Sequence, residues 1–252
     1  MAGSVISALF FTRVFSVVVS FEPYVALALT VWIIYTTDHL LDARRIAHPA
    51  STPRHQFHQA HFQILSRIAM LALFVDIIII FFLPLQLIYA GSMLAALVVV
   101  FLVIQASIPW IKELSIAIIY TSGILLPSVY NHIELRTSHY ILISQFLVTA
   151  FINLLIFSWI DTRSDRHDGL NSIVKHAGKK TTSLIIWSMI LVQFSLTASQ
   201  ILKGEVVKAS LIILFMTMLL LLVFKKRQSA ETNDTYRFLG DAVFMLPLIY
   251  ML

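Results

Sequence analysis

Long runs of apolar residues, separated by short polar segments, dominate the chain. The stretches 68–84, 140–160 and 206–224 are each close to the ~20 mostly apolar residues that cross a bilayer as a helix. Residues 77–82 are apolar at every position and lack the alternation of a barrel strand. Because lipid tolerates no open strand edge, these spans are expected to be helices. The pattern therefore predicts an all-α, polytopic membrane protein.

About nine transmembrane helices are predicted from the lengths of these runs. No segment between them is long enough for a soluble domain, so residues 1–252 are expected to form a single transmembrane domain. No basic region precedes the first apolar run, so no cleavable signal peptide is expected. The predicted helices cover residues 3–20, 22–42, 59–84, 86–105, 114–131, 138–162, 180–201, 205–224 and 237–252.

Composition and charge support this picture and add an orientation. Of the 252 residues, 59% are hydrophobic and 12% are charged, about half the charged share of soluble domains. Most of the 18 Lys and Arg residues lie in or beside the loops after the second, fourth, sixth and eighth predicted helices. Basic loops are typically cytoplasmic, which places these loops and the N-terminus in the cytoplasm. This asymmetry explains the net charge of +5 without a nucleic-acid partner.

Two short clusters of aspartates stand at the predicted cytoplasmic ends of helices. The first holds Asp38 and Asp42, and the second holds Asp161, Asp165 and Asp168. If each helix continues through its cluster, these spacings put the carboxylates on one face. Like charges so placed repel by a few tenths of a kcal/mol per pair. A bound divalent cation would reverse that cost, and Mg²⁺ is commonly held by carboxylates together with substrate phosphates.

Two alternatives to a magnesium site stay open for these carboxylates. As solvated helix ends, Asp165 and Asp168 would pair with Arg163, Arg166 or His167, although this is weaker for two clusters on one predicted face of the membrane. A transporter is the second alternative, but transporters place their sites near the bilayer midplane and these clusters lie at its edge. The absence of cysteine excludes thiolate metal sites.

Arg237, near the start of the last predicted helix, is expected to pair with Asp241 four residues later.

The segment DTRSDRHDGLNSIVKHAG at 161–178 resembles the second motif of the UbiA family of membrane prenyltransferases. That motif has an Asp, a second Asp four residues on, a Gly four after that, a small hydroxyl residue and then a Gly. The matching positions here are Asp161, Asp165, Gly169, Ser172 and Gly178.

Three further segments resemble this family. IPWIK at 108–112 is similar to a short loop that ends in a diphosphate-contacting Lys, here Lys112. Asp38 and Asp42 resemble the last two acids of the first motif, and Arg54 resembles a basic residue near the phosphates.

The chain also departs from the family pattern. Ile34 and Tyr35 stand where the first motif usually opens with Asn-Asp, and Glu113 stands where an Arg often follows the loop Lys.

The resemblance implies a helix bundle around a lipid-open central cavity and a Mg²⁺-dependent enzyme. The expected reaction transfers a prenyl group from its diphosphate to a lipophilic acceptor, with aromatic acceptors among the candidates. A terpene cyclase of the same family, and a non-catalytic relative that binds lipid, are the alternatives. The implied Mg²⁺ ligands and catalytic residues are Asp38, Asp42, Asp161 and Asp165, with Asp168 as a further ligand, and Lys112 and Arg54 would contact the diphosphate.

Asn153 is a further candidate for the substrate site. It precedes Asp161 by eight residues, about 80° around an ideal helix, and could reach the edge of the cavity. The alternative is a hydrogen bond between helices, which is common for Asn in membranes.

Overall fold

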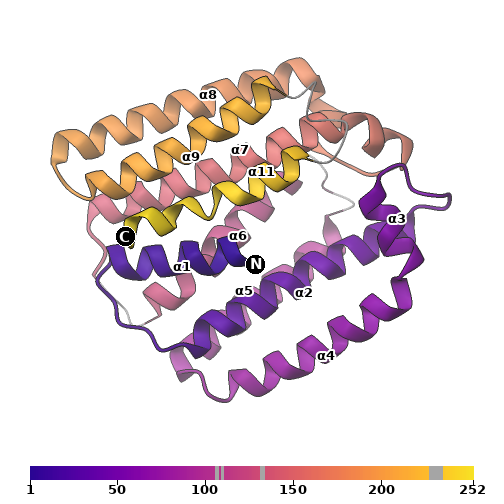
Figure 1. Cartoon of the computed structure of the whole chain (residues 1–252), viewed down its shortest axis with the longest axis horizontal. Helices are drawn as coiled ribbons and strands as arrows, with labels where there is room; N and C mark the ends of the chain where they lie inside the picture. Colours follow the sequence, from indigo (N-terminus) through magenta and orange to yellow (C-terminus); the bar gives the residue numbers. More distant parts are fainter. Residues whose placement is uncertain (106–107, 109–110, 131–133, 227–234) are drawn as a thin grey trace.

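A computed structural model of the chain describes residues 1–105, 108, 111–130, 134–226 and 235–252. Pro109, Trp110 and residue 131, which the sequence analysis placed in a site loop and at a helix end, lie outside the described residues. The described residues form helices and contain no β-strand, which confirms the all-α class (Figure 1). The elements are α1 (Ala2–Val14), α2 (Glu22–Arg45), α3 (Pro53–Ala60), α4 (Phe62–Ile80), α5 (Leu85–Ile104), α6 (Lys112–Val129), α7 (Thr137–His167), α8 (Ile173–Lys203), α9 (Val207–Lys225), α11 (Thr235–Val243) and the 3₁₀ helix η1 (Leu246–Tyr250).

Seven of the described helices are long and apolar enough to cross a membrane. A helix rises about 1.5 Å per residue, so close to 20 residues span the ~30 Å hydrocarbon core. Length and composition thus indicate a multi-pass membrane protein. The seven helices are α2, α4, α5, α6, α7, α8 and α9.

The first and last predicted helices, 3–20 and 237–252, are too long. Helix α1 ends at Val14, and Ser16 adopts a positive φ of 56°, which a helix cannot accommodate. At the other end α11 stops at Val243 and the chain continues as η1, which has a proline in its first turn. Both elements are too short to cross a bilayer, so nine transmembrane spans are not observed in the described residues.

The predicted helix 59–84 corresponds to α4, which is shorter at both ends, and a separate short helix, α3, precedes it. Thr52 caps the short helix α3 by accepting a hydrogen bond from the backbone N–H of His55, and a proline occupies its first turn. His61, with φ −111° and ψ 21°, ends α3 before α4 begins. Helix α3 is in contact with α2 and contains Arg54 and two buried histidines, His55 and His58.

Helix α7 lies at the centre of the fold and packs against α6, α8 and α9. Fully buried Leu142, Phe146 and Ile156 contribute to its apolar contacts. Hydroxyl and amide side chains add hydrogen bonds between helices. Gln145 on α7, for example, donates from Nε2 to Thr197 Oγ1 on α8 at 2.7 Å. Such buried polar contacts join helices where water is absent.

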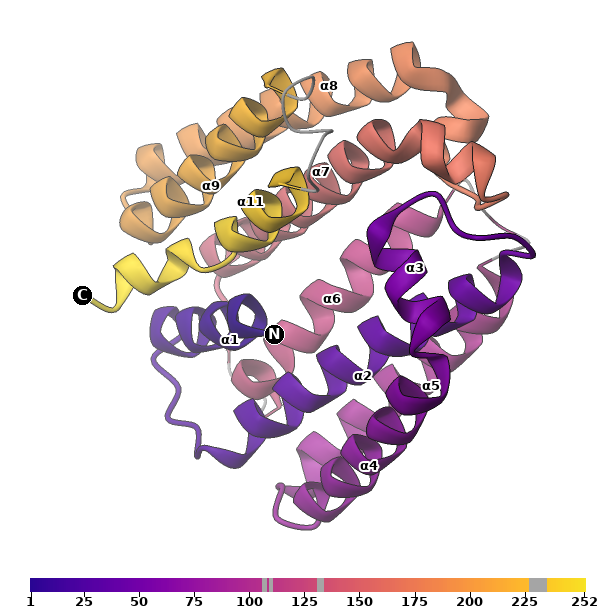
Figure 2. The ribbon, with the colours of Figure 1, turned by 45° about the vertical axis from the view of Figure 1, so that its right-hand side comes forward.

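The C-terminal ends of α2 and α7 lie at the same end of the bundle, beside α3 (Figures 1 and 2). Helix α11 begins near this end and runs along α7, with which it is in contact. Both aspartate clusters therefore reach one end of the molecule, although they are more than 100 residues apart in sequence.

Gly178 interrupts α8 close to the second aspartate cluster. Its φ of 82° and ψ of 157° are outside the helical region and open almost only to glycine. The next residue, Lys179, accepts a hydrogen bond from Trp159 Nε1 on α7 through its carbonyl oxygen at 3.1 Å. The break divides α8 into a short part before Gly178 and a long part after it.

Candidate functional site

Asp38 and Asp42 lie one turn apart on α2, which continues through the cluster to Arg45. Asp42 is buried and Asp38 is half-buried. Gln105, at the end of α5, donates a hydrogen bond from Nε2 to Asp38 Oδ1 at 3.1 Å, and Arg45 Nη1 lies 3.7 Å from Asp42 Oδ1. The expected spacing on one helix is confirmed, and each carboxylate interacts with the charge of the other.

Asp161 and Asp165 occupy the last turns of α7, which also continues through its cluster. Asp161 is buried and accepts hydrogen bonds from the Tyr236 hydroxyl and from Arg237 Nη2, both on α11. Asp165 is half-buried and interacts electrostatically with Asp161 and Arg237. The ion pair of Arg237 is thus formed with Asp161, and the expected pairing with Asp241 is wrong.

Lys112 brings positive charge between the two pairs of aspartates. It is the first residue of α6, at the same end of the bundle as the aspartates. Its ammonium group interacts electrostatically with Asp38 and Asp42 of the first cluster and with Asp165 of the second. The two clusters are therefore within electrostatic reach of one cation.

Arg54 on α3 is the second cation that both clusters share. Its charge interacts with Asp42 and with Asp165. Its Nη2 donates to His55 Nε2 at 3.2 Å, but its Nε and Nη1 are buried and have no hydrogen-bond partner in the described structure. An unsatisfied buried donor costs about 1–3 kcal/mol or more when charged, so this guanidinium fits an anionic ligand.

The residues present fit Mg²⁺ and a diphosphate in their chemistry. Each helix offers two carboxylates that repel each other, which a divalent cation would relieve. Arg54 and Lys112 supply donors suited to phosphate oxygens. Asp38, Asp42, Asp161 and Asp165 would hold the ions, and Asp161 would have to exchange its contacts with Tyr236 and Arg237 for the metal.

Asp168 stands apart from this group. Helix α7 ends at His167, and Asp168 turns toward the segment after α2. Ser51 donates to its carboxylate from the backbone N–H, at 3.0 and 3.1 Å, and from its hydroxyl at 2.9 Å. Burial opposes ionisation, but hydrogen bonds from His167 and Ser51 outweigh it and hold the pKa of Asp168 below its usual value. Its carboxylate therefore anchors the segment before α3, and its role as a Mg²⁺ ligand stays a prediction.

His55 lies between Arg54 and Asp168. Its Nδ1 is 3.6 Å from Asp168 Oδ2. Burial, followed by the positive charge of Arg54, lowers the pKa of His55 to about 4. His55 is therefore neutral near pH 7 and adds no charge to the site.

Asn153 lies against α11. It is buried, and a Cβ placed on Gly240 would come within 2.5 Å of its Oδ1. Its Oδ1 has no hydrogen-bond partner among the described residues, so the expected alternative of a helix–helix hydrogen bond is not observed there, and a contact of Asn153 with substrate stays a prediction.

Two hollows lie along α2, α3 and α4. One has a volume of about 760 Å³ and includes Arg44, His48 and Gln59 in its lining. The other, of about 250 Å³, is lined mainly by apolar residues such as Leu40 and Met70. Neither is lined by the four carboxylates, so a central cavity at the aspartates stays a prediction.

Comparisons with known proteins found no match to this chain among protein-family models, curated proteins or solved structures.

Three residues of the site were not identified from the sequence. Gln105 and Tyr236 belong to no recognisable motif. Arg237 was expected to pair with Asp241, which is only four residues away in the same helix. Their contacts with Asp38 and Asp161 depend on how α5 and α11 pack, which no local pattern encodes.

Proposed function

We propose that this chain is a membrane prenyltransferase of the UbiA type. It would use Mg²⁺ to ionise a prenyl diphosphate and would transfer the prenyl group to a lipophilic acceptor. The observation that carries the proposal is Arg54, whose buried and unpartnered donors lie within electrostatic reach of both aspartate clusters. A charged donor left unpaired in this setting favours a bound anion.

The side chains have distinct tasks in this proposal. Asp38 and Asp42 on α2, with Asp161 and Asp165 on α7, would hold Mg²⁺, which supplies neutralising charge for a diphosphate leaving group. Arg54 and Lys112 would bind the phosphate oxygens. Their positive charges are in place before the bond breaks, which favours departure of the diphosphate.

Bond cleavage takes place between the first carbon of the prenyl chain and the bridging oxygen. The bonding electrons leave with the diphosphate, and an allylic cation remains. Exclusion of water protects that cation until the acceptor attacks it, which forms the new bond to the first carbon of the prenyl chain and releases a proton from the acceptor. The apolar composition of the surrounding helices suits this requirement and would also receive the prenyl chain from the bilayer.

The basic residues beside the site suggest that it faces the cytoplasm, with a cytoplasmic N-terminus. Arg44, Arg45 and Arg54 follow or lie near the first aspartate cluster, and Arg163 and Arg166 lie within the second.

Product analysis with isotopically labelled prenyl diphosphates tests this proposal. Purified protein would be incubated with geranyl, farnesyl and geranylgeranyl diphosphate, Mg²⁺ and a total lipid extract. A labelled, lipophilic product that requires both Mg²⁺ and the extract is expected for transfer. A cyclic hydrocarbon or alcohol formed without extract would identify a cyclase instead. Unchanged diphosphates in every reaction, from folded protein, would contradict the proposal.

A further inference from the structure

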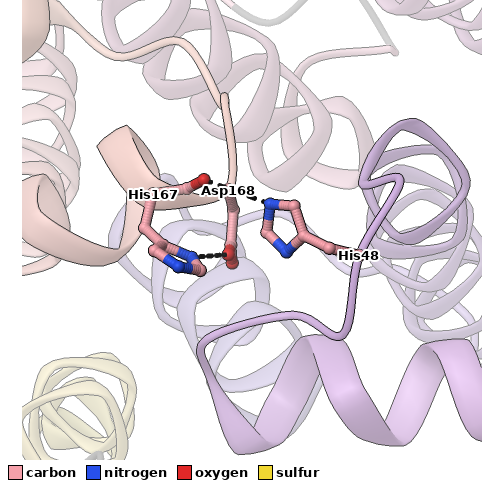
Figure 3. A group of neighbouring side chains, drawn as sticks. All are labelled: His48, His167 and Asp168. Carbon is pink, nitrogen blue, oxygen red and sulfur yellow. Dashed lines mark hydrogen bonds and ion pairs between the residues drawn. The ribbon is translucent and has the colours of Figure 1, made fainter.

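Three side chains with metal-binding groups meet where the segment after α2 crosses the end of α7 (Figure 3). His48, His167 and Asp168 each offer one ligand atom, and these atoms all lie within 4.8 Å of one another. His48 belongs to the segment between α2 and α3, whereas His167 ends α7 and Asp168 follows it. The cluster therefore joins two segments that are 119 residues apart in sequence.

The distances within the cluster suit a small metal ion. His167 Nδ1 lies 3.1 Å from Asp168 Oδ1. Two ligands of a tetrahedral zinc ion, each about 2.0–2.1 Å from the metal, are about 3.3–3.4 Å apart. This pair thus already has close to the required separation, and the ligand atom of the third residue, His48, lies within 4.8 Å of both.

Both ring nitrogens of His48 lie close to backbone carbonyl oxygens. Its Nδ1 lies 3.0 Å from the carbonyl oxygen of Pro49, and its Nε2 lies 3.2 Å from the carbonyl oxygen of His167. A neutral imidazole has one N–H, so these two hydrogen bonds belong to alternative tautomers. When Nδ1 donates to Pro49, the lone pair of Nε2 faces the carbonyl oxygen of His167, so the exposed ring has to turn before this lone pair can bind an ion. Metal-bound histidines commonly donate their other N–H to a backbone carbonyl in this way.

Asp168 provides a fixed ligand and the histidines provide mobile ones. The Asp168 side chain has no exposed surface and is held by Ser51 through three contacts. Both His48 and His167 are exposed, so an ion can enter from solvent and the rings can turn onto it.

We propose that His48, His167 and Asp168 form a binding site for a transition-metal dication of the zinc class. Two imidazoles and one carboxylate are typical ligands for Zn²⁺, whereas Mg²⁺ prefers oxygen ligands alone. The site uses Asp168 for zinc instead of Mg²⁺, shares no ligand with the four aspartates of the proposed diphosphate site and does not depend on that site. A bound ion would fasten the segment after α2 to the end of α7, the two helices that carry the aspartate pairs.

Zinc titration of the whole protein tests this proposal. Protein purified with a tag that contains no histidine would be treated with chelator, dialysed and titrated with ZnCl₂ in a calorimeter. Saturable binding of one ion per chain is expected, with a rise in the apparent Tm. We expect His48→Ala and His167→Ala each to weaken binding at least tenfold, because each removes one of three protein ligands. The matched control is His61→Ala, which removes an exposed histidine outside the cluster.

Absence of saturable binding, or the same affinity in the wild type and both histidine variants, would show that these residues hold no ion. Melting curves without metal would verify that each variant is folded. Because the titration uses zinc alone and no prenyl diphosphate, its outcome is separate from that of the proposed enzyme activity.

Discussion

Arg54 makes a hydrogen bond through Nη2, while its Nε and Nη1 are buried without a partner. We predict that Arg54→Gln weakens the binding of farnesyl diphosphate with Mg²⁺ about tenfold or more, because hydrogen bonds to charged groups contribute about 1.5–3 kcal/mol. Calorimetry on protein in nanodiscs measures this change. The matched control is Arg166→Gln, an exposed arginine on the last turn of α7 that should bind as the wild type does. Equal affinities for both variants would argue against Arg54 as a phosphate ligand.

The ion pair between Arg237 and Asp161 is mostly buried, with side-chain exposures of 22% and 7%. We predict that Arg237→Gln destabilises the protein by about 3 kcal/mol, because removing one partner leaves the other charge buried and unpaired. The double variant Asp161→Asn/Arg237→Gln should recover part of this loss, since neither charge then remains. Apparent Tm values in one detergent measure both effects. A double variant less stable than Arg237→Gln would contradict this account of the pair.

The sequence was informative about residues that act within one helix. Asp38 with Asp42, and Asp161 with Asp165, were placed on common faces because a helix repeats every 3.6 residues. Asp168 was grouped with them, but the helix ends one residue earlier and its carboxylate turns to Ser51. Its surroundings could not be predicted because they depend on a loop 117 residues away in sequence.

At the scale of elements, α11 packs tightly onto α7 through Gly240. A Cβ at this position would come within 2.5 Å of Asn153 Oδ1 and 2.6 Å of the Phe157 ring. We predict that Gly240→Ala destabilises the protein by about 1–3 kcal/mol, since overpacking forces neighbouring groups apart. Loss of the contact from α11 to Asp161 should follow, with lower activity.

Gly91→Ala on α5 is the matched control for this change. A Cβ on Gly91 would meet nothing within 4 Å, and alanine is the better helix former. We expect an unchanged or slightly higher apparent Tm. If Gly240→Ala behaved in the same way, α11 would not be packed on α7 as described.

Long apolar helices were predicted well, and the ends of the chain were not. Helices α5 and α9 match the predicted spans 86–105 and 205–224 to within two residues, because lipid crossing requires an uninterrupted apolar run. The predicted spans 3–20 and 237–252 were also apolar, but α1 and α11 stop early. Hydrophobicity alone cannot distinguish a short helix packed inside a bundle from one that crosses the membrane.

At the scale of the whole molecule, the account predicts which end faces the cytoplasm. The chain contains no cysteine, so single cysteines can be introduced and labelled without background. His176→Cys lies just after the second aspartate cluster, and Glu205→Cys lies between α8 and α9 at the opposite end of α8. We expect a membrane-impermeant maleimide to label position 176 only in inside-out vesicles and position 205 only in right-side-out vesicles. The reverse pattern would place the site on the outer face.

The central claim is that the two aspartate pairs act together to ionise a prenyl diphosphate. Release of inorganic diphosphate from farnesyl diphosphate, by purified protein with its lipid acceptors, tests it most directly. The account predicts release that requires Mg²⁺, falls about a hundredfold or more in Asp42→Asn and in Asp165→Asn, and is unchanged in Glu205→Gln, which alters an exposed acid far from the site. Release that is equally fast with chelator, or in both aspartate variants, would contradict the claim.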